Sequence, residues 1–95
     1  MSNPEIVMYS TQICPYCDRA KALLQRKHAA FREIKVDTQP EERAVMMARS
    51  GGRRTVPQIF IGDRHVGGFD DMVALDRAGE LDPLLAPFIT NTKSS

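Results

Sequence analysis

A strand–helix–strand pattern at the start of the chain constrains its fold more than any other feature. Residues 6–9, Ile-Val-Met-Tyr, form an apolar run with β character, and a segment rich in helix formers follows from Pro15 to about Ala29. Residues 31–37 alternate well enough to predict a second strand, and their charges favour an edge position in the sheet. Two strands joined by a helix are expected to pair in parallel through a right-handed crossover.

The rest of the chain adds a helix, a hairpin and two short helices to this unit. The predicted elements are a helix over 38–50, strands over 57–61 and 64–66, and helices over 70–79 and 82–87. Thr38-Gln39-Pro40-Glu41 has the spacing of a capping box, and Gly62-Asp63 is typical of a hairpin turn. The order β-α-β-α-β-β-α-α predicts an α/β fold, with a mixed four-stranded sheet and helices on both faces.

Length and charge exclude several classes of protein. A chain of 95 residues is long enough for one domain with one modest core, so we expect a single domain over 1–95 with a frayed polar tail at 90–95. The formal net charge of +1 favours neither a nucleic-acid partner nor an anionic membrane. No apolar run approaches the ~20 residues of a membrane span, and the N-terminus lacks a signal core. A cytoplasmic protein is therefore expected.

The only two cysteines, Cys14 and Cys17, lie three positions apart after the first predicted strand. A structural disulfide normally closes a longer loop, so in a reducing compartment this pair favours redox chemistry or a metal site. Zinc usually takes four ligands, and the only histidines, His28 and His65, are isolated in the sequence, so we expect no metal. Chance proximity of two buried cysteines is a third reading, which the strand-then-helix context and Pro15 disfavour.

The positions of the two cysteines predict different roles. Cys14 falls at or just before the first helical residue, where free N–H groups and the helix dipole favour the thiolate over the thiol. The thiolate is the nucleophile of disulfide exchange. Cys17 lies one turn further, on the apolar helix face that carries Ala20, Leu23 and Leu24, and is expected to be buried and protonated. We therefore expect Cys14 to attack and Cys17 to resolve the mixed disulfide.

Two further motifs indicate a peptide-like ligand. If Pro57 at the start of the third strand is cis, Val56 can offer its backbone N–H and C=O to an extended peptide, whereas a trans Pro57 would simply begin the strand. Gly67-Gly68 precede a helix whose N-terminus could bind a carboxylate. The same residues could form an ordinary turn with Asp70 as the N-cap, and both readings of this second motif can hold together.

Taken together, these residues resemble the glutaredoxin family, in its small bacterial dithiol class, from about Glu5 to Leu85. The resemblance rests on three motifs in this order: Cys14-Pro15-Tyr16-Cys17, Thr55-Val56-Pro57 and Gly67-Gly68-Phe69-Asp70-Asp71. Each motif is weak alone, and their combination at these spacings is specific. The resemblance implies a thioredoxin fold with sheet order 2-1-3-4 and a cis Pro57. It also implies a monomeric oxidoreductase that reduces protein disulfides and glutathione mixed disulfides, with glutathione as co-substrate and no bound cofactor.

The resemblance further implies which residues would bind glutathione: Tyr16, Thr55, Val56, Pro57, Gly68, Asp70 and Asp71. Tyr16 would flank the bound glutathione, Val56 would pair with the backbone of its cysteinyl part, and Thr55 would line the same groove. The N–H of Asp71 would hold the γ-glutamyl end. The residues themselves agree with this, because a tripeptide with two terminal carboxylates would meet a strand edge and a helix N-terminus.

Two positions depart from the family pattern. Thr11 stands where family members commonly carry a lysine, and Ala44 stands where a polar or cationic residue is usual. Both positions commonly help to hold the glycine carboxylate of glutathione. Arg43, Arg53 or Arg54 could supply the missing cation, or each could be an ordinary solvated residue.

Two alternative functions follow from these departures and from related proteins. The first is a redoxin recharged by thioredoxin reductase that donates electrons to ribonucleotide reductase; Thr11 favours it, whereas Gly67-Gly68 and Asp70-Asp71 favour glutathione. The second is a carrier that holds an iron–sulfur cluster between two subunits through thiolates and glutathione. Pro15 disfavours this carrier, because related proteins usually have glycine or serine near the motif. Ribonucleotide reductase is a target expected only at the level of the family.

Overall fold

The computed structural model describes residues 5–89 and contains a mixed four-stranded sheet. Its strands are β1 (Ile6–Ser10), β2 (Arg32–Lys35), β3 (Gln58–Ile61) and β4 (Arg64–Gly67). They lie in the order β2-β1-β3-β4; β1 and β2 are parallel, and β1–β3 and β3–β4 are antiparallel. The predicted sheet order and the edge position of β2 are confirmed. The predicted frayed tail, 90–95, lies outside the described residues.

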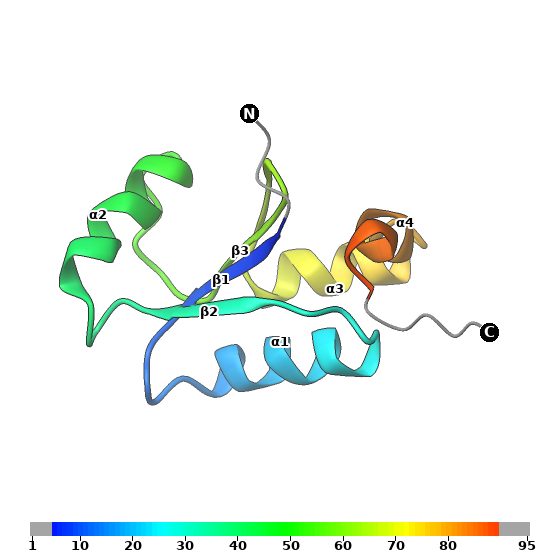
Figure 1. Cartoon of the computed structure of the whole chain (residues 1–95), viewed down its shortest axis with the longest axis horizontal. Coiled ribbons are helices and arrows are strands. Elements are labelled where there is room, and N and C mark those ends of the chain that lie inside the picture. The colour runs from blue at the N-terminus through cyan, green and yellow to red at the C-terminus, as the bar shows by residue number, and fades with distance from the viewer. Residues whose placement is uncertain (1–4, 90–95) are drawn as a thin grey trace.

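Helices cover both faces of this sheet (Figure 1). On one face lie α1 (Pro15–Arg26), α3 (Phe69–Arg77) and α4 (Leu81–Leu85), and on the other lies α2 (Pro40–Arg49). A short 3-10 helix over Ala86–Phe88 follows α4. Within the described part of the chain, no helix has both the length and the apolar character needed to cross a membrane.

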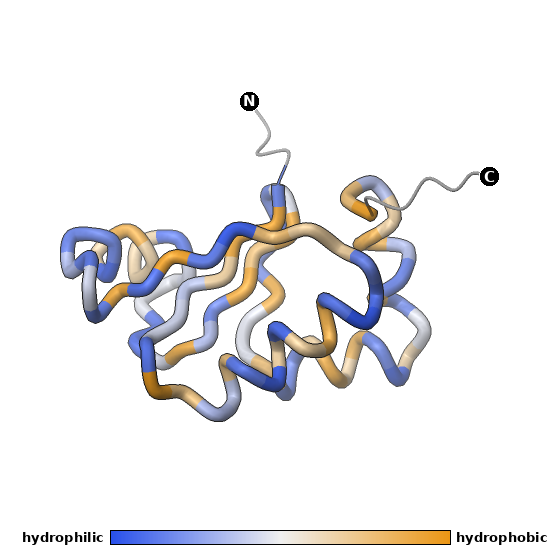
Figure 2. The backbone as a smooth tube through the Cα atoms, turned by 60° about the horizontal axis from the view of Figure 1, so that its bottom comes forward, coloured by the Kyte–Doolittle hydropathy of each residue, from blue (hydrophilic) through white to orange (hydrophobic). Residues whose placement is uncertain are grey.

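The two central strands are buried on both faces and supply two separate cores. In β1, Ile6 and Met8 pack with α1, α3 and α4, whereas Val7 and Tyr9 pack with α2. Successive side chains of a strand point to opposite faces, so both sets must be apolar, and the strand reads as one continuous apolar run. Figure 2 shows the resulting orange colour along the central strands and the blue stretches on the surrounding helices.

Strand pairing brings three connecting segments to one end of the sheet. Tyr9 near the end of β1 pairs with Gln58 at the start of β3, and Ile59 pairs with Gly67 at the end of β4. The segment after β1, the segment before β3 and the segment after β4 therefore meet at the same edge. These segments carry the three motifs that the sequence analysis singled out.

Local hydrogen bonds move two helix ends away from their predicted positions. The first helix ends at Arg26 rather than near Ala29, because Lys27 caps it and His28 adopts a left-handed φ of 60°. The predicted capping box is wrong, since Gln39 is the N-cap of α2 and makes no side-chain bond there. Thr38 instead donates from its hydroxyl to the carbonyl of Lys35 at 3.2 Å, which closes the preceding turn.

The remaining boundaries differ from the predictions by one or two residues. Strand β3 begins at Gln58 rather than Pro57, because proline has no N–H to donate to a sheet. Strand β1 extends to Ser10, β2 spans only Arg32–Lys35, β4 extends to Gly67, and α4 spans Leu81–Leu85.

Candidate active site

The two cysteines form a disulfide at the start of α1. Cys14 is the N-cap residue, and its Sγ accepts a hydrogen bond of 3.1 Å from the backbone N–H of Cys17. Pro15 follows as the first helical residue, where its missing N–H costs no helical hydrogen bond. Cys14 is 9% exposed and Cys17 is 1% exposed. The predicted position of Cys14 and the burial of Cys17 are confirmed.

This helix start suits reversible disulfide chemistry. The Cα atoms of Cys14 and Cys17 are 5.1 Å apart, within the usual range for a disulfide, so the backbone holds the two sulfurs within bonding reach. The N–H of Cys17 points at Cys14 Sγ, and the positive end of the α1 dipole lies beside it. Both would stabilise a thiolate on Cys14 once the disulfide is reduced.

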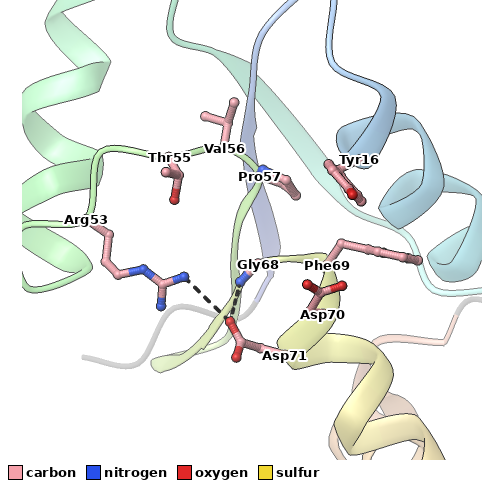
Figure 3. Close-up of a pocket in the computed structure, with 9 residues that line it drawn as sticks. All are labelled: Tyr16, Arg53, Thr55, Val56, Pro57, Gly68, Phe69, Asp70 and Asp71. Atoms are coloured by element: carbon pink, nitrogen blue, oxygen red, sulfur yellow. Dashed lines mark hydrogen bonds and ion pairs between the residues drawn. The ribbon is translucent and has the colours of Figure 1, made fainter.

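A cavity of about 230 Å³ lies between α1, the segment before β3 and the start of α3. Its lining residues are Tyr16, Arg53, Thr55, Val56, Pro57, Gly68, Phe69, Asp70 and Asp71 (Figure 3). All seven residues expected from the resemblance to bind glutathione are among them. Phe69 was not predicted as a lining residue, although it lies inside one of the motifs.

The segment Thr55–Val56–Pro57 forms one side of this cavity, opposite residues 68–71 (Figure 3). The Val56–Pro57 peptide bond is cis, so the trans reading of this motif is wrong. Val56 is half-buried and precedes the first residue pair of β3. Its backbone therefore lies at the entrance to the sheet, where an extended peptide could add as a strand.

The start of α3 forms the opposite side of the cavity. Its N-cap is Gly68 and not Asp70, because Asp71 reaches back to accept a hydrogen bond of 2.8 Å from the Gly68 N–H. The preceding Gly67 has a φ of 114°, and a Cβ there would clash with the Asp71 carboxylate. The N–H groups of the first turn have no acceptor within a helix, so they are available to an anionic ligand.

A buried amide holds Thr55 at the edge of the cavity. Gln58 is fully buried, and its Nε2 donates to the Thr55 carbonyl at 3.0 Å and to the Thr55 hydroxyl at 3.2 Å. Its Oε1 lies 2.7 Å from His65 Nε2. Since an amide oxygen can only accept, His65 must donate from Nε2. This pair was not predicted from the sequence, where the signal for it is a polar residue at the start of an otherwise apolar strand.

The surroundings of His65 lower its pKa and so favour its neutral form. Burial lowers the pKa of His65, the positive charge of Arg53 lowers it further, and Arg49 adds to this, while Asp71 acts in the opposite direction. The imidazole also stacks on Phe60, with ring centroids 4.8 Å apart. A neutral ring with its proton on Nε2 matches the hydrogen bond to Gln58.

Among the three candidate arginines, the structure places only Arg53 in the lining of this cavity. Its Nη2 lies 3.6 Å from the Asp71 carboxylate (Figure 3). Arg43 and Arg54 do not line the cavity, and neither do Thr11 and Ala44. Within residues 5–89, no three side chains of Cys, His, Asp or Glu are grouped so that they could hold a metal ion.

Comparison with known protein sequences agrees with this geometry. A family model described as Glutaredoxin matches residues 6–66. The chain is 59% identical to a glutaredoxin of Pseudomonas aeruginosa over 83 residues, which cover 87% of this chain and 98% of that protein. It is 54% identical to glutaredoxin 3 of Escherichia coli over 85 residues, which cover 90% of this chain and 99% of that protein.

Solved structures show the same fold. A buckwheat glutaredoxin in complex with glutathione matches with a TM-score of 0.79 and 34% identity, over 86% of this chain and 76% of that one. The solution structure of a glutaredoxin from Brucella melitensis matches with a TM-score of 0.74 and 57% identity, over 85% and 87%. The fold is therefore the thioredoxin fold of these relatives. With its Cys14–Cys17 pair at the start of α1, the chain belongs to the glutaredoxin family of thiol–disulfide oxidoreductases.

Proposed function

We propose that this chain reduces protein disulfides and glutathione mixed disulfides, with glutathione as the electron donor. The observation that carries the proposal is the cavity beside the dithiol helix, where a strand entrance faces the N-terminus of α3. A tripeptide with a peptide backbone and two terminal carboxylates fits such a pair of surfaces. The solved complex of the buckwheat relative with glutathione supports this ligand.

Glutathione would lie across the cavity with its cysteine sulfur toward Cys14. The backbone of Val56 would pair with the cysteinyl residue, and the first-turn N–H groups of α3 would hold the γ-glutamyl carboxylate. Arg53, the cation in the cavity lining, would bind a terminal carboxylate and would exchange part of its contact with Asp71 for it. Tyr16, Thr55 and Pro57 would form the walls.

For a glutathione mixed disulfide, one cysteine is sufficient. The Cys14 thiolate attacks the glutathione sulfur, the S–S bond breaks, and the target leaves as a thiolate that takes a proton from water. Cys14 now carries glutathione. The thiolate of a second glutathione attacks the sulfur of the bound one, which releases glutathione disulfide and restores the Cys14 thiolate.

For a protein disulfide, both cysteines take part. Cys14 attacks one target sulfur and releases the other as a thiolate. Cys17 then loses its proton and attacks the Cys14 sulfur, which releases the reduced target and leaves the Cys14–Cys17 disulfide. The disulfide present in the structure is the expected product of this route. Two glutathione molecules then reduce it in two successive exchanges and leave as glutathione disulfide.

We also infer that residues 1–95 act as one domain in the reducing cytoplasm, where closely spaced cysteines serve redox chemistry rather than structure. Disulfide-bonded or glutathionylated proteins are the proposed partners, with ribonucleotide reductase as a candidate at the level of the family. Cys14 and Cys17 are the residues on which this function depends.

The test is turnover of a glutathione mixed disulfide coupled to glutathione, glutathione reductase and NADPH. Saturable turnover is expected. It should be lost in Cys14→Ser and retained in Cys17→Ser, because the mixed-disulfide route needs one thiol. No turnover by a protein with intact thiols, together with recharging by thioredoxin reductase in the absence of glutathione, would replace this proposal with the alternative redoxin.

A further inference from the structure

Helices α1 and α3 lie on the same face of the sheet (Figure 1). A second hollow lies between them. Its volume is about 280 Å³. Its apolar lining comes from Ala22, Leu23, Phe69 and Val73, and its charged lining comes from Arg19, Arg26, Arg77 and Asp76. We refer to these eight residues as the α1–α3 groove.

Phe69 connects the α1–α3 groove to the glutathione cavity, because it lines both. Its ring extends from the start of α3 toward Tyr16, and the two ring centroids are 6.2 Å apart (Figure 3). The guanidinium of Arg19 lies over the Tyr16 ring, 5.3 Å from its centre. A polypeptide attached to a cysteine at Cys14 could therefore continue past Tyr16 into the groove.

The arginines of the groove have no counter-charge in the part of the chain that the structure describes. Within residues 5–89, neither Arg26 nor Arg77 has an ion pair or a hydrogen-bond partner for its guanidinium. Asp76 is the one carboxylate in the lining, and it is ion-paired with Lys27 at 2.8 Å. The groove therefore offers an apolar lining edged by cations whose charge is not neutralised within the described chain.

The distance from Cys14 sets the length of segment that the groove could receive. Arg19 and Arg26 follow Cys14 by five and twelve residues, which at a helical rise of about 1.5 Å corresponds to roughly 8 and 18 Å along α1. An extended chain advances about 3.3 Å per residue. Side chains about two to five positions from the target cysteine would reach the arginines.

We propose that the α1–α3 groove docks an acidic segment of the protein substrate, which flanks the target cysteine and carries at least one apolar side chain. Carboxylates would pair with Arg26 and Arg77, and the apolar side chain would lie against the half-buried Phe69 and Val73. The apolar lining argues for a polypeptide rather than a free anion, since an anion alone would leave it uncovered. This inference rests on the proposed function, because it concerns the substrates of the same dithiol.

The test uses two cysteine peptides, each prepared as a mixed disulfide with glutathione. The acidic peptide has aspartates and one leucine about two to five positions from the cysteine on both sides, and the basic peptide has lysines in place of the aspartates. The wild-type protein is expected to turn over the acidic peptide with a higher kcat/KM at low salt. This preference should decrease as salt is added, because salt screens charges at an exposed groove.

The decisive variant is Arg26→Gln/Arg77→Gln, which removes the two unpaired charges. For the acidic peptide we expect kcat/KM to fall about fivefold, which is the order of magnitude for losing two exposed charge pairs. The control, Arg32→Gln/Arg64→Gln, removes the same net charge at the end of the sheet away from the dithiol, where Arg32 is paired with Glu5, and should change kcat/KM less than twofold. Turnover of the small mixed disulfide of cysteine and glutathione should be unchanged in both.

Three results would overturn the groove proposal: no preference of the wild type for the acidic peptide, an equal loss in the control variant, or an equal loss with the small disulfide. Binding of the same peptides with serine in place of cysteine, followed by fluorescence anisotropy, tests the groove without any redox step. If the small disulfide is not turned over but the acidic serine peptide binds through Arg26 and Arg77, the proposed function fails and the groove stands. If neither serine peptide binds preferentially, the groove fails whatever the activity is.

Discussion

At the scale of single residues, Gln58 links the core of the sheet to the edge of the cavity beside the dithiol helix. Its amide bridges Thr55 before β3 and His65 on β4, and it is completely shielded from solvent. Replacing it with an apolar residue would leave the Thr55 carbonyl and the His65 N–H without a partner. A buried polar group without a partner costs about 1–3 kcal/mol.

We therefore predict that Gln58→Leu lowers the free energy of unfolding by about 2–4 kcal/mol and raises KM for a glutathione mixed disulfide more than it lowers kcat. The reason is that Thr55 is released while the dithiol on α1 is untouched. Urea unfolding and steady-state kinetics measure the two effects. The exposed Gln25 on α1 provides the control, since Gln25→Leu should change neither quantity. Unchanged stability in Gln58→Leu would show that the amide does not hold the loop.

His65 makes the stability depend on pH in mildly acidic solution. Its folded-state pKa is lowered, first by burial and then by Arg53 and Arg49, against the opposing effect of Asp71. The unfolded chain therefore binds a proton more readily than the folded one, and stability falls as pH drops below the ordinary value of about 6.5. This loss continues until the pH has passed the lowered pKa of the folded state.

His65→Gln is predicted to reduce this pH dependence, because glutamine can donate to Gln58 and does not titrate. Urea unfolding at pH 7, 6 and 5 should show a smaller loss of stability in the variant than in the wild type. Glu33 adds to the pH dependence of stability at more acidic pH. Burial alone would raise the pKa of Glu33, but hydrogen bonds from Ser10 and Lys21 outweigh the effect of burial and lower this pKa. The same loss between pH 7 and 5 in both proteins would rule out His65 as the cause.

At the scale of secondary-structure elements, the ends of α1 and α3 form the site. Cys14 caps α1 with its sulfur, and Asp71 closes the start of α3 onto the N–H of Gly68. The end of α2 is fixed differently, since Arg49 donates to the Tyr9 hydroxyl at 3.1 Å and lies 4.2 Å from the centre of the Phe60 ring. The sheet thus anchors α2 through side chains and leaves the starts of α1 and α3 beside the cavity.

Gly67→Ala should disturb the start of α3 more than the backbone strain at residue 67 alone would, because the new Cβ also meets Asp71. A left-handed φ costs a non-glycine residue about 1–2 kcal/mol, and the new Cβ would also displace the Asp71 carboxylate. Gly79→Ala is a matched control, because Gly79 has a φ of 75° and open space around its Cβ position. Both variants should lose stability in urea unfolding, and only Gly67→Ala should raise KM for the glutathione mixed disulfide. Equal KM values in the two variants would contradict this.

At the scale of the whole molecule, the described surface does not present one large apolar face. The large apolar side chains that are exposed are Ile13, Tyr16, Val45 and Ile89. Ile13 and Tyr16 flank the dithiol, whereas Val45 lies on α2 and Ile89 lies at the end of the described chain. A stable protein interface buries about 800 Å² on each partner, which two side chains beside the dithiol do not supply.

We therefore predict a monomer under reducing, oxygen-free conditions in the presence of glutathione. Sedimentation velocity and the visible absorption spectrum of the same sample check this. A monomer without a visible band agrees with an oxidoreductase. A dimer with an absorption band would instead support the iron–sulfur carrier, in which two chains share a cluster through thiolates and glutathione.

The sheet order was implied by the resemblance to the glutaredoxin family, whereas local patterns in the sequence were sufficient for the order of the elements, both helix layers and the placement of Cys14 at a helix start. These depend on strand and helix periodicity, on Pro15 and on the spacing of the two cysteines, all of which act between neighbouring residues. The capping box at Thr38 and the N-cap at Asp70 were predicted wrongly because several acceptors compete locally. Thr38 instead donates to the carbonyl of Lys35, and the Gly68 N–H donates to the carboxylate of Asp71.

Only the tertiary structure decided which distant residues meet. Three features join residues from different elements. They are the position of Arg53, rather than Arg43 or Arg54, in the cavity lining, the bridge from His65 through Gln58 to Thr55, and the α1–α3 groove. Such contacts depend on strand register and on how helices pack across a sheet, so patterns among neighbouring residues do not predict them. The sequence alone therefore determined the fold and the redox pair, and packing determined the shape and charge of the surfaces around that pair.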